Sequence, residues 1–436
     1  MSKQLILKPR QIYLDKLIGF QDTEPVKVVT GVRRCGKSSL LKLMIAHLQQ
    51  TGIKDDQIVE MNFESFKYKN MTADELYAYV QKYAKSHKRL YLFFDEIQRI
   101  KDWEGAVNAF RVDLDCDIYI TGSNAYLLSS EYSTYLSGRY VEIKMLPLLF
   151  REFLLFHDFI EKKEKNLLGN YQWKIYDKKG NSYDVKEIFS AYLHYGGLPG
   201  IAAVGLDQEK ALAFLDGIYS TVVIRDILER EKRRGQRKIT DGLLLRKIIL
   251  FLADNIGSNI SAASLGNVLC NTGAMTNRKD NPSTHTIQAY IQALLESYIF
   301  YESKRFDIKG KGLLRTLGKY YIVDMGLRNY LLGFQDRDRG HILENVVYLE
   351  LRGRGYDVAV GKIANREVDF IATKGEEKVY FQVTETMARE EVRARELEAL
   401  EKIDDNYEKI VLTMDRPLVT SYEGIKVKFL PDWLLE

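Results

Sequence analysis

The chain has 436 residues, of which 46% are hydrophobic and 28% charged, and its net charge is only +4. This length suggests about two to four domains of an ordinary folded protein, and the small net charge singles out no class of partner. Cys35, Cys116 and Cys270 are too widely spaced for a disulfide framework or a Cys-rich zinc site.

Neither a signal peptide nor a membrane span is predicted. The first ten residues lack the apolar core and the small-residue cleavage site of a signal peptide. The most apolar run, residues 248–253, is far shorter than the roughly 20 residues that cross a bilayer. We therefore expect a cytoplasmic protein with no membrane partner.

A phosphate-binding loop is the most specific motif. Residues 31–38, Gly-Val-Arg-Arg-Cys-Gly-Lys-Ser, fit the pattern G-x-x-x-x-G-K-[ST]. A β-branched run at 26–30 predicts a buried strand before the loop, and helical apolar spacing at 39–48 predicts a helix after it. Glycines let backbone N–H groups turn towards a phosphate, and the helix N-terminus adds a positive dipole.

Two side chains of this motif have separate roles. Lys37 would reach the β- and γ-phosphates of a nucleotide, and the Ser38 hydroxyl would ligate Mg²⁺. The alternative is a chance match in a glycine-containing turn, which the flanking strand and helix disfavour. The predicted nucleotide contacts are Gly31, Val32, Arg33, Arg34, Cys35, Gly36, Lys37, Ser38 and Ser39.

An apolar strand at residues 90–94 ends in two carboxylates, Asp95 and Glu96. In parallel sheets, functional groups follow the carboxyl ends of such strands. Asp95 would complete the Mg²⁺ shell, and Glu96 would orient and polarise an attacking water. A solvated turn is the alternative for these residues in isolation.

A third strand is predicted at residues 117–121, and polar residues follow it. Ser123 or Asn124 could hydrogen-bond the water or the γ-phosphate, or could simply cap a helix. Arg139 lies in a loop before a further strand and is a candidate arginine finger, acting in cis or in trans. The alternative role for Arg139 is a surface salt bridge.

The order of these motifs, with Asn62-Phe63-Glu64 between them and residues 146–153 after them, resembles a prokaryotic family of AAA-type P-loop ATPases. Members carry a C-terminal domain of uncharacterised function. The resemblance implies ATP as the nucleotide, a three-layer α/β/α core, Lys37 and Ser38 on the phosphates and Mg²⁺, and Asp95 and Glu96 as the second acidic motif. It further implies Ser123 or Asn124 as sensor and Arg139 as finger, and a finger acting in trans implies a homo-oligomer.

The middle of the chain is similar to a winged helix. After a charged helix and a hairpin in residues 155–190 and a basic cluster at 230–238, helices are expected at 242–253, 261–269 and 283–295 and strands at 299–304 and 319–323. DNA contact is one interpretation, and protein contact is the other. The third helix would present Thr284, His285, Gln288 and Gln292 to a major groove, and the wing would carry Lys304, Arg305, Lys309 and Lys311.

The last hundred residues resemble restriction-endonuclease-like nucleases. These hold Mg²⁺ with an early Glu, a strand Asp and an acidic-x-Lys motif on the next strand. Glu344 and Asp369 match this pattern, but Gln382 replaces the second carboxylate and Thr384 replaces the lysine. We therefore expect a degenerate nuclease fold that binds nucleic acid or a partner, with Glu344, Asp369 and Gln382 as a tentative second metal site.

The predicted organisation is an ATPase core (1–155), a lid and connector (156–235), a winged-helix-like domain (236–335) and an endonuclease-like domain (336–436). The predicted function is Mg²⁺-dependent ATP hydrolysis that couples nucleotide state to DNA binding or assembly. Two alternatives remain, a nucleotide-gated DNA nuclease and a non-enzymatic switch that recruits a protein partner.

Overall fold

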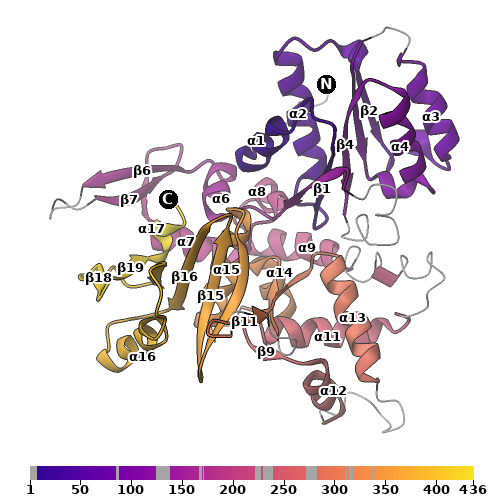
Figure 1. Ribbon diagram of the computed structural model, residues 1–436. Coiled ribbons are helices and arrows are strands. Elements are labelled where there is room, and N and C mark those ends of the chain that lie inside the picture. The colour runs from indigo at the N-terminus through magenta and orange to yellow at the C-terminus, as the bar shows by residue number, and fades with distance from the viewer. Residues whose placement is uncertain are drawn as a thin grey trace. The chain divides into compact units, whose positions relative to one another are not determined.

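The structure is a computed structural model that describes residues 7–84, 88–123, 138–165, 169, 171–220, 227–228, 239–271, 282–310, 312–313, 318–334 and 338–436 (Figure 1). The chain divides into two compact units. The first is Met1–Pro147 with Glu296–Tyr298, and the second is Leu148–Leu295 with Ile299–Glu436. Within the described residues, no helix combines the length and apolarity that crossing a membrane requires.

The first unit is built on a five-stranded parallel sheet, which confirms the predicted α/β core. Its order is β2-β3-β4-β1-β5, so β1 lies between β4 and β5. All six residues of β1 and of β3 are buried, as expected for strands covered on both faces. The strands are β1 (Val26–Gly31), β2 (Ile58–Asn62), β3 (Leu90–Asp95), β4 (Cys116–Gly122) and β5 (Tyr140–Met145).

Helices cover the faces of this sheet (Figure 1). Leu92, Phe94 and Ile120 on the strands pack with Val107 and Phe110 of α4, and each is fully buried. Burying a side chain of this size contributes about 1.5–3 kcal/mol, so this layer anchors the sheet. The helices are α1 (Gln11–Gly19), α2 (Lys37–Gln50), α3 (Ala73–Gln81) and α4 (Trp103–Asp113).

A buried ion pair lies near the amino end of the sheet. Lys27 Nζ of β1 lies 2.5 Å from Asp117 Oδ1 of β4, and neither side chain is exposed. The second oxygen of Asp117 accepts from Tyr119 Oη and from the Asp22 backbone N–H, each at 2.8 Å. Burial lowers the pKa of Lys27, and the hydrogen bond to Asp117 opposes that shift. The pair is therefore part of a closed network that joins two central strands.

The second unit begins earlier than residue 155, because α6 (Phe150–Phe156) packs on α7 and α8. Residues 160–165, expected within a charged helix, form a strand instead. Their lysines pair across the hairpin with aromatic rings, with Lys163 over Trp173 at 5.5 Å and Lys165 over Tyr171 at 5.3 Å. The elements are β6 (Ile160–Lys165), β7 (Tyr171–Tyr176), β8 (Ser182–Asp184), α7 (Val185–Tyr195), α8 (Pro199–Val204) and α9 (Gln208–Ile218).

Helices are present at all three segments expected in the middle of the chain. Asp241 caps the first of them, accepting from the N–H groups of Leu243 and Leu244. A three-stranded antiparallel sheet, β10-β13-β9, accompanies them. The elements are α11 (Gly242–Asp254), β9 (Asn259–Ile260), α12 (Ala262–Asn271), α13 (Thr284–Glu296), β10 (Phe300–Ser303), β13 (Gly318–Ile322) and α14 (Met325–Leu332).

The two strands expected at 299–304 and 319–323 are present as β10 and β13 and pair antiparallel, whereas the basic residues expected on the wing between them join another sheet. β11 (Arg305–Asp307) pairs in parallel with β14 of the C-terminal sheet, and β12 (Gly312–Leu313) pairs with β11. Phe306 and Ile308 pack against the core of that sheet, which explains why the segment joins it. Lys304, Arg305 and Lys309 therefore belong to the edge of the C-terminal sheet, and Lys311 lies outside the described residues.

The C-terminal part is an eight-stranded sheet with order β12-β11-β14-β15-β16-β17-β19-β18. β14, β15 and β16 are antiparallel neighbours, whereas β16, β17 and β19 run parallel. The remaining elements are α15 (Arg339–Gly353), β14 (Asp357–Ile363), β15 (Arg366–Lys374), β16 (Glu377–Thr384), α16 (Glu390–Glu401), β17 (Glu408–Thr413), β18 (Ser421–Tyr422), β19 (Ile425–Phe429) and α17 (Leu430–Trp433).

Replacing Lys27 by Met should lower the free energy of unfolding by about 3–5 kcal/mol, because Asp117 would remain buried without its cation. Urea denaturation followed by circular dichroism measures this. Lys88→Met is the control, since Lys88 forms an exposed pair with Asp56 at 3.5 Å and should cost less than about 1 kcal/mol. Equal losses in the two variants would contradict the structural role of the buried pair.

Candidate functional site

The phosphate-binding loop connects β1 to α2 and depends on its glycines. Gly31 has φ +141°, and a Cβ there would lie 2.1 Å from the Met145 carbonyl oxygen of β5. Gly36 has φ +105° directly before the helix. The loop therefore needs glycine at both ends for its backbone conformation, and at Gly31 also for lack of space.

Lys37 lies across this loop. Its side chain is buried, and Nζ donates to the carbonyl oxygens of Gly31 at 3.0 Å and Val32 at 3.2 Å. Ser38 is exposed on the first turn of α2. The predicted lysine and hydroxyl are thus both at the start of the helix, as the motif requires.

Arg10 supports the loop from outside the motif. Its guanidinium is buried and donates to Cys35 O at 3.0 Å, to Leu146 O at 3.1 Å and to Pro147 O at 3.3 Å. Burial raises the pKa of the Cys35 thiol, which favours a neutral packing side chain. Nothing in the sequence around Arg10 signals this role, because its partners are distant along the chain.

Asp95 is oriented by two neighbouring strands. Its Oδ1 accepts from Thr121 Oγ1 at 2.5 Å, and its Oδ2 accepts from Asn62 Nδ2 at 2.8 Å. Asn62 ends β2 and Thr121 lies near the end of β4, so β3 holds its terminal carboxylate between them. The sequence analysis had identified the segments that contain Asn62 and Thr121, but it had not assigned a contact to either side chain.

Glu96 follows in a left-handed conformation, with φ +56°. Its backbone N–H donates to Thr121 Oγ1 at 2.9 Å, and its carboxylate accepts from Ser123 Oγ at 3.2 Å and from Gln98 Nε2. A non-glycine residue with positive φ is uncommon and frequently marks a functional site. Ser123 therefore contacts the predicted water-orienting carboxylate, whereas Asn124 lies outside the described residues.

The oxygen donors at the carboxyl ends of β1 and β3 fit Mg²⁺. A serine hydroxyl and a carboxylate are hard oxygen ligands, and Ser38 and Asp95 supply one each. Asp95 is already fixed by two hydrogen-bond donors, which is the kind of support that orients metal ligands.

Arg139 lies at the amino end of the strands, whereas the phosphate-binding loop follows their carboxyl end. β1 and β5 are parallel with Val26 opposite Tyr140, and the Val26 N–H donates to Arg139 O at 3.0 Å. Gly31 is five residues further along β1, which corresponds to roughly 17 Å. An arginine side chain cannot span that distance, so Arg139 could reach a phosphate only on another subunit, and its alternative role as a surface ion-pair residue stays open.

Arg33 has a partner that the sequence did not identify. Arg33 of the loop and Arg99 each donate to Glu64 Oε1, at 3.0 and 3.1 Å. The Glu64 N–H in turn donates to Asn62 Oδ1 at 2.8 Å. The phosphate-binding loop and the two acidic strand ends are therefore linked by one surface network.

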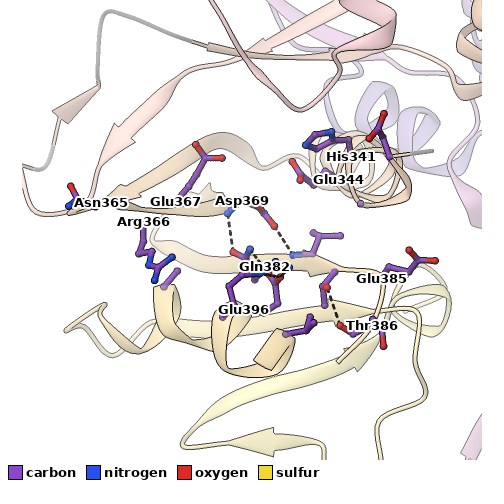
Figure 2. A pocket seen from close by; sticks show the side chains of 17 residues that line it. His341, Glu344, Asn365, Arg366, Glu367, Asp369, Gln382, Glu385, Thr386 and Glu396 are labelled. Carbon is purple, nitrogen blue, oxygen red and sulfur yellow. Dashed lines mark hydrogen bonds and ion pairs between the residues drawn. The ribbon is translucent and has the colours of Figure 1, made fainter. Parts of the chain in front are cut away.

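A second group of predicted residues surrounds a pocket of about 620 Å³ in the C-terminal part. Figure 2 shows Glu344 on α15, and Asp369 and Gln382 on the adjacent strands β15 and β16, around one hollow. Glu367 and Glu396 line the same pocket and were not predicted. The fold thus brings the three tentative ligands together.

Each tentative ligand is engaged within the protein. Asp369 Oδ2 accepts from the Val383 N–H at 2.8 Å, and Gln382 Oε1 accepts from the Asp369 N–H at 3.3 Å. Gln382 Nε2 donates to Glu396 Oε2 at 2.9 Å. Burial, and then the charge of Glu344, raise the pKa of Asp369 well above its ordinary value.

A lysine is present in this region, but it comes from another strand. Lys319 of β13 is buried, and its Nζ lies 3.0 Å from Glu344 Oε2 and 2.7 Å from Glu367 Oε1. Burial would lower the pKa of Lys319, but the surrounding carboxylates outweigh it and raise that pKa. Thr384, at the position of the missing lysine, donates to Thr386 O at 3.2 Å. Across the described part of the chain, no three His, Cys, Asp or Glu side chains are arranged to hold a metal ion.

Comparisons with known proteins match the chain to two family models and two relatives. A model described as an AAA domain matches residues 23–154, and a domain of unknown function matches residues 186–338. An uncharacterised protein of Haemophilus influenzae is 40% identical over 438 residues, with 100% of both chains covered. An uncharacterised protein of Methanocaldococcus jannaschii is 32% identical over 384 residues, which cover 86% of this chain and 78% of the relative.

Two solved structures are similar at low identity. A Walker-type ATPase of Pyrococcus abyssi is 15% identical with a TM-score of 0.47, covering 74% of this chain and 95% of its own. An ORC2 protein of Aeropyrum pernix, solved as ADPNP-ADP complexes, is 11% identical with a TM-score of 0.39, covering 78% of this chain and 92% of its own.

Replacing Gly31 by Ala should destabilise the first unit by about 2 kcal/mol or more, because the added methyl group meets a backbone oxygen and the positive φ is strained. Gly19→Ala is the control, since no atom lies within 4 Å of its Cβ position. Thermal unfolding of both variants measures the difference. An unchanged midpoint for Gly31→Ala would mean that β5 does not approach the loop as described.

Proposed function

Since the chain belongs to a family of AAA-type P-loop ATPases, we propose that it binds ATP with Mg²⁺, hydrolyses it, and couples nucleotide state to DNA binding or assembly. One observation carries the hydrolysis proposal. The loop with Lys37 follows β1, and the Asp95–Glu96 pair follows β3, so both lie at the carboxyl edge of one parallel sheet. Phosphate-binding groups and a water-orienting carboxylate are then available at the same edge.

The residues at this edge would have separate roles. The backbone N–H groups of the loop and the N-terminus of α2 would bind the phosphates, and the Lys37 ammonium would leave the loop carbonyls for phosphate oxygens. Ser38 and Asp95 would hold Mg²⁺, which when bound neutralises charge developing on the phosphates. Glu96 would accept a proton from the attacking water or orient it.

Ser123 and Gln98 orient the Glu96 carboxylate. Both side chains donate to the same carboxylate oxygen, Oε2, which leaves Oε1 to accept a hydrogen bond from a water. Ser123 is therefore suited to sense the occupant of the site, because its hydroxyl already lies on the reacting carboxylate.

The coupling to DNA is supported by α13. Thr284, Gln288 and Gln292 recur at intervals of four, so they lie along one face of the helix, and all three are exposed with His285. The opposite face is buried through Ile287 and other apolar residues. An exposed polar helix face of this kind suits a groove of DNA, although Lys304, Arg305 and Lys309, expected on the wing, lie at the edge of the C-terminal sheet.

A nucleotide-gated nuclease is the second candidate, because Glu344, Asp369 and Gln382 meet in one pocket. Cleavage of plasmid DNA that Asp369→Ala abolishes would favour it. The buried Lys319 ammonium, 3.0 Å from Glu344 Oε2, counts against a metal there, so we rank this function below ATP hydrolysis.

Glu96→Gln should lower the rate of phosphate release by about 10²–10⁴-fold and leave ATP binding intact, because only the proton acceptor is lost. Lys37→Ala should weaken ATP binding itself. Lys42→Ala is the matched control, as Lys42 is exposed on the same helix and should change neither quantity. ATP binding without phosphate release in wild type would instead favour the non-enzymatic switch.

A trans role for Arg139 predicts complementation between inactive variants. Arg139→Ala and Lys37→Ala should each release little phosphate alone, whereas their mixture should recover activity. In a mixed oligomer, an intact loop of one subunit meets an intact arginine of another. The measurement is phosphate release at increasing ratios of the two proteins. Absence of recovery, with oligomers formed, would remove Arg139 from the site.

DNA should stimulate phosphate release, and His285→Glu and Gln288→Glu should reduce the stimulation while the rate without DNA stays unchanged. The added carboxylates would repel the DNA phosphates, so the effect should shrink at high salt. Gln208→Glu on α9 adds the same charge at another exposed position and serves as the control. Stimulation that none of these changes affects would place the DNA contact elsewhere.

A further inference from the structure

Several buried acids line the C-terminal pocket, and of its lining cations the exposed Arg395 pairs with Glu396 at 2.7 Å. Glu344, Asp369 and Glu396 are each 7% exposed. A carboxylate removed from water must be paired or protonated, since an unpaired buried charge costs several kcal/mol. The question is therefore which cation this arrangement uses.

Lys319 is positioned as that cation. It is 3% exposed, and its single nitrogen lies within 3.0 Å of carboxylate oxygens on two different elements, Glu344 of α15 and Glu367 of β15. Tyr321, two residues along β13, places its hydroxyl 3.5 Å from the same oxygen of Glu344. A bridging position between two carboxylates is one that a divalent ion would otherwise take.

The metal expected from the nuclease resemblance does not fit beside this lysine. Glu344 Oε2 is bound to the ammonium, Asp369 Oδ2 to a backbone N–H, and Gln382 spans two partners of its own. A divalent ion that used these atoms would sit close to a positive charge that cannot leave without unpairing Glu367. Like charges at such distances repel by several kcal/mol in a buried site.

We propose that the Lys319 ammonium permanently replaces a divalent metal in the C-terminal pocket, bridging Glu344 and Glu367 as their countercharge. The pocket is then a metal-free site. The nuclease pattern lacks its lysine on β16, but a buried lysine on β13 pairs with two of the acids that line the same pocket.

Lys319 comes from β13, so its ion pair with Glu367 of β15 connects two sheets. β13 belongs to the three-stranded sheet that accompanies α11–α13, and Asn259 of β9 in that sheet also donates to Glu367, at 3.0 Å. The helical middle segment and the C-terminal sheet are therefore joined at the pocket floor. Removing the ammonium should both loosen this junction and free the acids for a metal.

The test compares Mn²⁺ binding to the nucleotide-free wild type and to Lys319→Ala, by thermal unfolding and by Mn²⁺ electron paramagnetic resonance. The Asp95→Asn background removes the acidic ligand of the first unit from both proteins. We expect millimolar Mn²⁺ to leave the unfolding midpoint of the protein that retains Lys319 unchanged. We expect it to raise the lowered midpoint of Lys319→Ala by several degrees, and a further Asp369→Asn change should abolish that rise.

Two results would overturn the proposal. One is bound Mn²⁺ in the protein with Lys319 intact that Asp369→Asn or Glu344→Gln removes. The other is a folded Lys319→Ala variant that gains no Mn²⁺ site. If Lys319→Ala does not fold, titration of the Lys319-containing protein and its Asp369→Asn variant decides the matter, and Lys319→Arg should retain both the fold and the lack of response to Mn²⁺.

Discussion

The geometry of the first unit depends on one hydroxyl group between two parallel strands. Thr121 Oγ1 of β4 donates to the Asp95 carboxylate and accepts from the Glu96 backbone N–H. The parallel register brings the ends of β3 and β4 together. The Thr121 hydroxyl then fixes the side chain of Asp95 and the backbone of the next residue, Glu96. Asp95 is held as a potential metal ligand, and Glu96 is held in a left-handed conformation.

Local patterns were enough to predict the parts of the fold that follow from local chemistry. Residues 31–38 carry their own conformational demands, and fully apolar runs such as that of β3 have few alternatives to a buried strand. The helices at α11, α12 and α13 were also predictable, because each has apolar residues at helical spacing. Asp95 and Glu96 could be placed at the same sheet edge as the phosphate-binding loop because strand ends in a parallel sheet share one edge.

Contacts between distant segments could not be predicted in this way. Arg10 and Leu146 are 136 residues apart, and Lys319 meets Glu344 across two elements, so no spacing reveals either pair. The position of Arg139 depends on the strand order, in which β5 lies beside β1. β11 joins the C-terminal sheet because Phe306 and Ile308 pack against the core there. This pairing is decided by tertiary packing, and the basic composition of the segment gave no sign of it.

The contacts of Arg10 give the phosphate-binding loop a mechanical connection to the exit of its own domain. One guanidinium holds Cys35 O in the loop and the carbonyl oxygens of Leu146 and Pro147, where the first unit ends. A displacement of Cys35 must therefore either stretch these hydrogen bonds or move residues 146 and 147 with the loop.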